Sequence, residues 1–193
     1  MNIVIIKYNA GNIRSVKMAL QRLGFQSTVS DDPQIIRSAD KVIFPGVGEA
    51  SSAMAYLKEK GLAELIPQLT QPLLGICLGL QLMARRSAEN DTKCLDIIPE
   101  DIRKFPAEGK VPHIGWNTIY NLRGPLFEDV PENSYVYFVH SYYLPLNKQG
   151  CAQTDYLAPF QSAVQKDNFF AVQFHPEKSG AAGEKILDNF LRL

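Results

Sequence analysis

The segment 72–81 (PLLGICLGLQ) constrains what this chain can fold into more than any other stretch of its length. An apolar run leads to Cys77, which has a glycine two residues before it and two residues after it, and an apolar pattern typical of a helix follows. We therefore predict a strand, a sharp turn and a helix, with the sulfur at the corner. Gly75 and Gly79 let the two segments pack closely around a strained corner residue.

The first part of the chain alternates predicted strands with predicted helices. Residues 3–6 form a continuous apolar run, which is typical of a strand buried on both faces. Apolar residues at helical spacing predict a helix over 12–23, ended by Gly24, and a second helix over 51–60. Further strands are predicted over 25–29, 41–44 and 72–76. This order indicates an α/β fold with a doubly wound, mostly parallel central sheet and helices on both faces.

The second half of the chain has a different pattern. Short β-rich runs punctuated by Pro and Gly predict strands over 116–120, 134–139, 163–165 and 169–174. We expect them to add antiparallel strands to one side of the parallel core. An amphipathic helix is predicted over 179–193, with Ser179 as its cap. No linker or internal repeat interrupts the sequence, so residues 1–193 are expected to form a single domain.

Charge and cysteine usage exclude several classes of function. Lys plus Arg equal Asp plus Glu at 20 each, so electrostatics favour neither nucleic acid nor a membrane as partner. No apolar run approaches the roughly 18 residues of a membrane span, and the start is too short for a secretory signal. Three widely spaced cysteines argue against a disulfide framework and indicate a reducing cytoplasm. The Cys and His residues show no metal-ligand spacing, so no metal is expected.

A nucleophilic thiol needs a base and a group that orients the base. His175 follows an apolar run and precedes a proline, which places it at the end of a predicted strand. Glu177 lies two residues further on, where an extended chain puts both side chains on one face. Cys77, His175 and Glu177 are therefore the predicted catalytic residues.

The remaining candidate nucleophiles and bases are interpreted as structural. His113 and His140 have no neighbouring carboxylate in sequence and are read as structural or site-lining residues. Cys94 and Cys151 are read as buried or incidental thiols.

A second glycine-rich turn, at 44–48 (FPGVG), follows the third predicted strand. It is too short for a dinucleotide fingerprint and lacks the Lys-Ser/Thr pair of a phosphate loop. Acyl transfer needs backbone N–H groups directed at a developing oxyanion. We expect one donor at Leu78, the residue after the nucleophile, and another at Val47 or Gly48.

With these residues in hand, the chain resembles the class I (triad) glutamine amidotransferases, whose two signatures match 75–81 (GICLGLQ) and 175–177 (HPE). Five further blocks resemble the glutaminase subunits of imidazole glycerol phosphate synthases of histidine biosynthesis, at 8–16, 45–48, 111–117, 137–143 and 173–179. The resemblance runs nearly end to end. It implies a flavodoxin-like fold of that family and no cofactor.

The resemblance also implies an activity and a partner. Cys77 would attack the side-chain amide of glutamine, a thioester would form, and water would release glutamate. The ammonia would pass to a (β/α)₈-barrel cyclase subunit in a heterodimer, which makes imidazole glycerol phosphate and an aminoimidazole carboxamide ribonucleotide. The residues expected to hold glutamine are Gly46, Gln81, Ser141 and Tyr142. Those expected to face the cyclase are Asn12, Trp116, Tyr137 and Lys178.

A partner is also indicated by chemistry, because ammonia released into neutral water becomes ammonium, a poor nucleophile. The resemblance implies that the unpaired glutaminase is nearly idle, and a flip of the 46–47 peptide is the hypothesis for its activation. Three alternatives stay open. The chain could be a partner-free hydrolase of γ-glutamyl substrates, a binding protein that kept the fold, or the glutaminase of a tryptophan, folate or GMP synthase.

Overall fold

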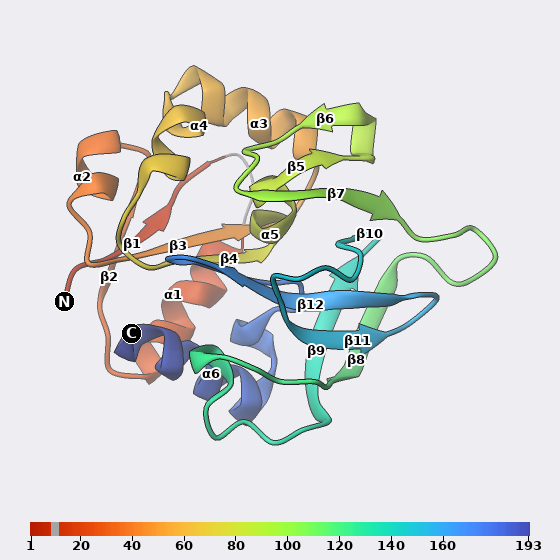
Figure 1. Cartoon of the computed structure of the whole chain (residues 1–193). Helices are drawn as coiled ribbons and strands as arrows, with labels where there is room; N and C mark the ends of the chain where they lie inside the picture. Colours follow the sequence, from red (N-terminus) through yellow and green to blue (C-terminus); the bar gives the residue numbers. More distant parts are fainter. Residues whose placement is uncertain (9–11) are drawn as a thin grey trace.

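The computed structural model describes residues 1–8 and 12–193. Residues 9–11 of the block 8–16 therefore lie outside the described part. At the centre is a seven-stranded sheet with the order β11-β12-β13-β4-β3-β1-β2 (Figure 1). In spatial order its strands are β11 (Gly150–Asp155), β12 (Pro159–Lys166), β13 (Phe169–Val172), β4 (Leu73–Cys77), β3 (Lys41–Gly46), β1 (Ile3–Ile6) and β2 (Ser27–Ser30).

The direction of the strands confirms the predicted mixed sheet. The pairs β13–β4, β4–β3, β3–β1 and β1–β2 are all parallel. The pairs β11–β12 and β12–β13 are antiparallel, so β11 and β12 extend one side of the parallel core. The strand predicted over 169–174 as an antiparallel addition is β13, which instead runs parallel to β4. All the parallel strands except β2 are buried along their whole length, as their continuous apolar runs predict.

Helices cover both faces of the sheet (Figure 1). Ile3 and Ile5 pack in one core cluster with residues of α1 and α6, whereas Val4 and Ile6 pack in the other with residues of α2, α3, α4 and α5. The helices are α1 (Ile13–Arg22), α2 (Pro33–Arg37), α3 (Ala50–Glu59), α4 (Leu62–Leu65), α5 (Leu78–Met83) and α6 (Gly180–Arg192). No helix among the described residues combines the length and apolarity that a membrane span requires.

Two smaller sheets flank the central one. The four-stranded sheet has the order β10-β7-β5-β6, and a two-stranded ribbon pairs β8 with β9. Their strands are β5 (Ala84–Ser87), β6 (Thr92–Lys93), β7 (Ile98–Lys104), β8 (His113–Ile119), β9 (Ser134–His140) and β10 (Tyr142–Tyr143). The predicted strands over 116–120 and 134–139 thus exist, but they pair with each other instead of joining the central sheet. In β9 buried and more exposed residues alternate, so one face of the ribbon remains open to solvent.

The predicted cap of the last helix is wrong in its contacts. Ser179 precedes α6, but its side chain makes no capping hydrogen bond. Its hydroxyl instead donates to the carbonyl oxygen of His175 at 2.6 Å and accepts from the backbone N–H of Tyr137 at 2.9 Å. Ser179 therefore ties the segment after β13 to the ribbon strand β9.

Candidate active site

Cys77 lies at the corner between β4 and α5, as the glycine spacing predicts. Its backbone has φ 54° and ψ −106°, a region that a residue with a side chain rarely adopts. Such a conformation costs about 1–3 kcal/mol and persists only where the surroundings enforce it. A Cβ on Gly79 would lie 1.9 Å from the carbonyl oxygen of Phe44, and one on Gly75 would lie 2.7 Å from the sulfur of Met83. The two glycines therefore let α5 pack directly against β3 and β4.

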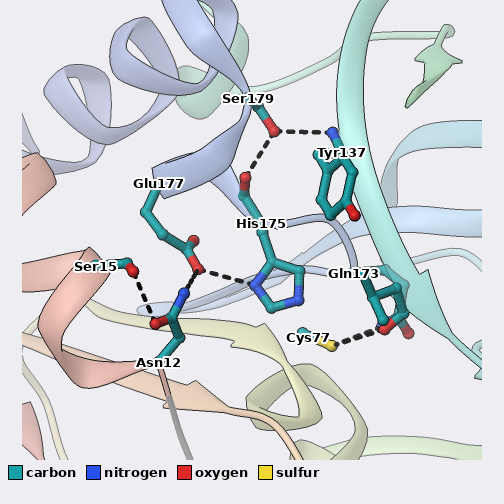
Figure 2. A network of polar contacts seen from close by, with 9 residues as sticks. Asn12, Ser15, Cys77, Tyr137, Gln173, His175, Glu177 and Ser179 are labelled. Carbon is teal, nitrogen blue, oxygen red and sulfur yellow. Dashed lines mark hydrogen bonds and ion pairs between the residues drawn. The ribbon is translucent and has the colours of Figure 1, made fainter. Parts of the chain in front are cut away.

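The structure brings the three predicted catalytic residues together (Figure 2). His175 Nδ1 lies 2.9 Å from Glu177 Oε1, and both side chains are buried. The imidazole lies between this carboxylate and the Cys77 sulfur. Burial lowers the pKa of His175, but hydrogen bonds and charge interactions with Cys77 and Glu177 outweigh it and raise the pKa to about 10. The protonated imidazole is thus favoured next to the thiol at neutral pH.

A second layer of polar contacts holds the carboxylate (Figure 2). Asn12 Nδ2 donates to Glu177 Oε1 at 3.4 Å, and Ser15 Oγ donates to Asn12 Oδ1 at 2.7 Å. The backbone N–H of His175 also donates to the carbonyl of Tyr137 at 2.9 Å. Asn12 and Tyr137, predicted to face a partner, therefore contact the residues predicted to be catalytic.

A pocket of about 260 Å³ opens on Cys77. Among the residues that line it are the predicted oxyanion residues and three predicted glutamine-binding residues, namely Val47, Gly48, Leu78, Gln81, Ser141 and Tyr142. Gly46 is buried at the end of β3, where it pairs with Cys77, and does not line the pocket. The described residues hold no cluster of three or more His, Cys, Asp or Glu that could bind a metal ion.

The oxyanion turn follows β3 directly. Val47 is 41% exposed, and Gly48 has φ 114°, which is accessible mainly to glycine. A Cβ on Gly46 would lie 2.7 Å from Leu78 Cβ and closer still to the Tyr8 hydroxyl. Gly46 is therefore fixed by packing, whereas Gly48 is the position that the backbone conformation reserves for glycine.

Gln173 contacts the nucleophile, although the sequence analysis assigned it no role. Its Nε2 donates to Cys77 Sγ at 3.6 Å, and its Oε1 accepts from Gln81 Nε2 at 3.1 Å. The same Gln81 nitrogen donates to the carbonyl of Tyr142 at 3.1 Å. Gln173 stands two residues before His175, as Glu177 stands two residues after it, so the two-residue spacing was also a signal for Gln173. The predicted extended chain from His175 to Glu177 is wrong, however, because the backbone bends at 173–174 and Glu177 lies in a 3₁₀ turn (Pro176–Lys178).

Glu89 is a second site residue that the sequence analysis missed. It belongs to a short 3₁₀ turn (Glu89–Asp91), lines the pocket and accepts from the backbone N–H of Ala50 at 2.7 Å. Burial raises the pKa of its carboxyl group. No local motif marks this residue, because only the packing of the turn against α3 brings it to the pocket.

The residues interpreted as structural or site-lining, His113, His140, Cys94 and Cys151, are all buried. His113 Nδ1 lies 3.0 Å from His140 Nε2, and His140 also lines the pocket. Burial lowers the pKa of His113 to about 4, and it is the main cause that lowers the pKa of His140 to about 3. Burial also raises the pKa values of Cys94 and Cys151 to about 12.

The other predicted interface residues form one surface cluster. The rings of Trp116 and Tyr137 meet edge to face with centroids 6.0 Å apart, and Lys178 Nζ lies 5.8 Å from the Tyr137 ring centroid. Trp116 is 55% exposed, and the exposed Ile114, Tyr135 and Val139 extend the apolar face of the ribbon.

The chain belongs to the glutamine amidotransferase class-I family, whose model matches residues 4–193. Solved structures support the same fold. A putative GMP synthase protein from Thermoplasma acidophilum superposes with a TM-score of 0.78 at 19% identity, covering 100% of this chain and 92% of that one.

Two relatives with full-length alignments narrow the comparison to one kind of amidotransferase subunit. The imidazole glycerol phosphate synthase subunit HisH of Bacteroides fragilis is 55% identical, and its namesake in Escherichia coli is 50% identical. Each alignment covers 100% of this chain and 100% of the relative.

Proposed function

We propose that this chain is the glutaminase subunit of an imidazole glycerol phosphate synthase and supplies ammonia for histidine biosynthesis. The full-length identity of 50–55% to subunits of that name supports this assignment. The observation that carries the chemistry is the buried contact of Cys77, His175 and Glu177 beside a pocket that could hold glutamine. The family match over 4–193 supports one amidotransferase domain, and three free cysteines fit the cytoplasm as its compartment.

The first half of the reaction forms a thioester. The Cys77 thiolate attacks the side-chain carbonyl carbon of glutamine, and the carbonyl oxygen becomes an oxyanion. The protonated His175 then gives its proton to the amide nitrogen, the C–N bond breaks, and ammonia leaves. Glu177 stabilises the charged imidazole and fixes its orientation through the Nδ1 contact at 2.9 Å.

The second half regenerates the Cys77 thiolate and the protonated His175. His175, now neutral, takes a proton from water while the water oxygen attacks the thioester carbonyl, and the C–S bond breaks to release glutamate. Both halves pass through an oxyanion, for which the N–H groups of Leu78 and of Val47 or Gly48 are the proposed donors. These residues all line the pocket with Cys77.

The polar groups of the pocket fit an amino-acid substrate. The backbone of Ser141 and Tyr142, together with the Gln81 side chain, would hold the glutamine, and Gly46 supports the turn beside it. We add Glu89, because a pocket-lining carboxylate suits the α-ammonium group of glutamine.

The open face of the ribbon is the proposed cyclase surface. Trp116, Tyr137 and Lys178 form its centre, and Tyr137 is joined through its backbone to His175. Asn12, at the N-terminal end of α1, contacts the Glu177 carboxylate. A (β/α)₈-barrel seated on this surface would lie next to the catalytic residues, so ammonia could pass across without meeting solvent.

The partner would also act on the oxyanion turn. A flip of the peptide between Gly46 and Val47 would add or remove one donor, which is worth about 10²–10³ in rate. Gly48→Ala disfavours the φ of 114° and is the sharper test, because Gly46→Ala would clash with packed side chains. We expect Gly48→Ala to reduce partner-stimulated activity far more than unstimulated activity. Full retention of stimulation would argue against the flip.

Glutamine hydrolysis by the chain with and without a barrel cyclase and its nucleotide ligand tests the assignment. We expect little hydrolysis alone and a many-fold rise in the complex, whereas high activity alone would favour a partner-free hydrolase. Cys77→Ala should abolish glutamine-dependent synthesis but leave synthesis from ammonium salts at raised pH. Loss of both activities would show that Cys77 does more than cleave the amide.

A further inference from the structure

A chain of hydrogen bonds through two buried histidines lies outside the proposed catalytic residues. His113 and His140 are directly opposed across β8 and β9, and His113 Nδ1 lies 3.0 Å from His140 Nε2. At one end, His140 Nδ1 lies 2.8 Å from the carbonyl oxygen of Tyr142. At the other end, the amide nitrogen of Asn117 lies 3.4 Å from His113 Nε2. The chain thus joins the ribbon to a residue that lines the pocket.

The partners at each end fix where the protons lie. A carbonyl oxygen only accepts, so His140 Nδ1 carries a proton and donates to Tyr142. A neutral His140 therefore accepts at Nε2, and His113 must donate to it from Nδ1. His113 Nε2 is then an acceptor, which suits the amide group of Asn117. Each of the three hydrogen bonds then has one donor and one acceptor. All three are donated in the same direction, from Asn117 through His113 and His140 to Tyr142 at the pocket.

The surroundings keep both rings neutral. The His113 ring is stacked between Phe138 and Tyr156, with centroid distances of 4.8 and 3.9 Å. His140 lies 5.2 Å from the ring of Phe105 and 5.1 Å from that of Phe160. Within the described part of the chain, this aromatic cage supplies no carboxylate to either ring.

The other titratable groups near His140 act in the same direction. Burial lowers the pKa of His140 most, the bond to Tyr142 raises it, and the charges of His113 and His175 lower it further. Protonation at Nε2 would also set a donor against the His113 donor. The donors and acceptors in this series of hydrogen bonds therefore keep the same order at neutral pH.

This series of hydrogen bonds ends at Tyr142, in the segment proposed to hold glutamine. The carbonyl of Tyr142 accepts from both His140 and Gln81, and the carbonyl of Ser141 accepts from the N–H of Phe105 at 3.0 Å. The backbone of Ser141 and Tyr142 is thereby held from three elements. Removing the His140 donor takes away one of the two hydrogen bonds to the Tyr142 carbonyl, while the contact from Gln81, the Phe105 N–H and the pairing of Tyr142 with Lys104 of β7 remain.

We propose that His140, oriented by His113, is a positioning residue that fixes the Ser141–Tyr142 backbone in the geometry that binds glutamine. This inference rests on the proposed glutaminase function. The histidines hold the segment in the ground state and the transition state alike, so their loss weakens substrate binding without slowing the chemical step.

Two substitutions at His140 separate positioning from packing. In His140→Asn the side-chain amide can occupy the place of Nδ1 and still donate to Tyr142, whereas in His140→Gln it reaches the place of Nε2 instead. Both remove the imidazole from the same aromatic cage. We expect His140→Gln to raise KM for glutamine roughly 5- to 10-fold with kcat within about 2-fold, and His140→Asn to raise KM by no more than about 2-fold.

Steady-state hydrolysis in the activated complex gives these constants. Equal rises in KM in both variants, or a fall in kcat without a change in KM, would overturn the positioning role. Absence of hydrolysis by the wild-type complex would instead overturn the proposed function itself. If either His140 variant fails to fold, His113→Asn and His113→Gln carry the same test, since only the asparagine can donate from the Nδ1 position.

The proton assignment has its own readout. Nitrogen NMR of histidine-labelled wild-type protein should show His113 and His140 neutral and protonated at Nδ1 near neutral pH. A ring protonated at Nε2 would reverse the chain and contradict the inference, whether or not the protein hydrolyses glutamine.

Discussion

Two histidine sites lie beside the same pocket, and the pKa values of their rings are shifted in opposite directions. His140 lines the pocket, and His175 contacts Cys77, which also lines it. The ribbon pair, His113 and His140, lies among aromatic rings, and burial lowers both pKa values. His175 is just as buried, but Cys77 and Glu177 outweigh burial and raise its pKa to about 10. The difference shows that burial alone makes a histidine a neutral structural group. Contact with a thiol and with a buried carboxylate instead favours the protonated ring.

The first prediction applies one type of substitution to both sites. His175→Asn removes the proton carrier, and we expect kcat for glutamine hydrolysis to fall by about 10⁴ or more. His113→Asn should lower kcat by less than about 10-fold, since that ring lies two contacts away from the substrate segment. Steady-state kinetics of the complex measure both. Comparable losses in kcat would erase the distinction between the sites.

The second prediction removes only the carboxylate that sets the two sites apart. Glu177→Gln should lower kcat by roughly 10³, and it should shift the pKa of His175 downward because burial and Cys77 remain while the contribution of the carboxylate is lost. The folded pKa of about 10 keeps the ring protonated through neutral pH, so the basic limb of the kcat profile should move to lower pH in the variant. Glu59→Gln, at an exposed carboxylate of α3, is the control. If the basic limb of the kcat–pH profile does not move in Glu177→Gln, that limb reports the titration of a group other than His175.

The third prediction extends the comparison to the thiols. Cys94 and Cys151 are buried, and their pKa values are raised to about 12, so they hold little thiolate at neutral pH. Cys77 lies beside a cationic imidazole, and iodoacetamide should modify it at least about 10²-fold faster than the other two. Peptide mass analysis of a time course gives the three rates. Faster labelling of Cys94 or Cys151 would contradict the assignment of Cys77 as the reactive thiol.

The fourth prediction uses the opposite pKa shifts to separate the sites by stability. The pKa of His140 is about 3 in the folded protein, below the ordinary value of 6.5. The neutral ring therefore contributes stability that is complete above about pH 6.5 and is lost as the pH falls towards 3. Between about pH 7.5 and about pH 5 this loss amounts to about 2 kcal/mol, and His140→Gln should remove it.

The raised pKa of His175 acts with the opposite sign. Its contribution is complete below the unfolded pKa and declines as the pH rises towards 10. His175→Gln should therefore make the loss of stability on acidification steeper. Urea unfolding at the two pH values measures both slopes, and equal slopes in the wild type and both variants would rule out the opposite shifts.

The predictability of the fold follows from how each element is stabilised. β1, β3 and β4 were predicted because each is a continuous apolar run, which only a fully buried strand requires. β5 was not predicted, since two of its residues are exposed arginines and its pairing with β6 and β7 is decided by distant partners. The ribbon strands were predicted, but their pairing was not, because alternation marks a half-buried strand without naming its neighbour.

The residues of the candidate site also differ in whether a local sequence signal or only a contact between distant segments marks them. Cys77, His175 and Glu177, which the structure brings together, were predicted because glycine spacing, a strand end and a two-residue step are local signals. Gln173 had such a signal and was overlooked, whereas Glu89 had none, because only the contact of its turn with α3 brings it to the pocket.

The sequence alone determined the alternating α/β order and the strained corner at Cys77, and it singled out His175 and Glu177 as candidate partners. These features depend on backbone sterics and on neighbours a few residues away. Only the tertiary structure decided which histidine ring has a raised pKa and which segments line the pocket. Those properties depend on desolvation and on contacts between β4, β9, β10 and the segment after β13, which are far apart in the chain and meet only when it folds.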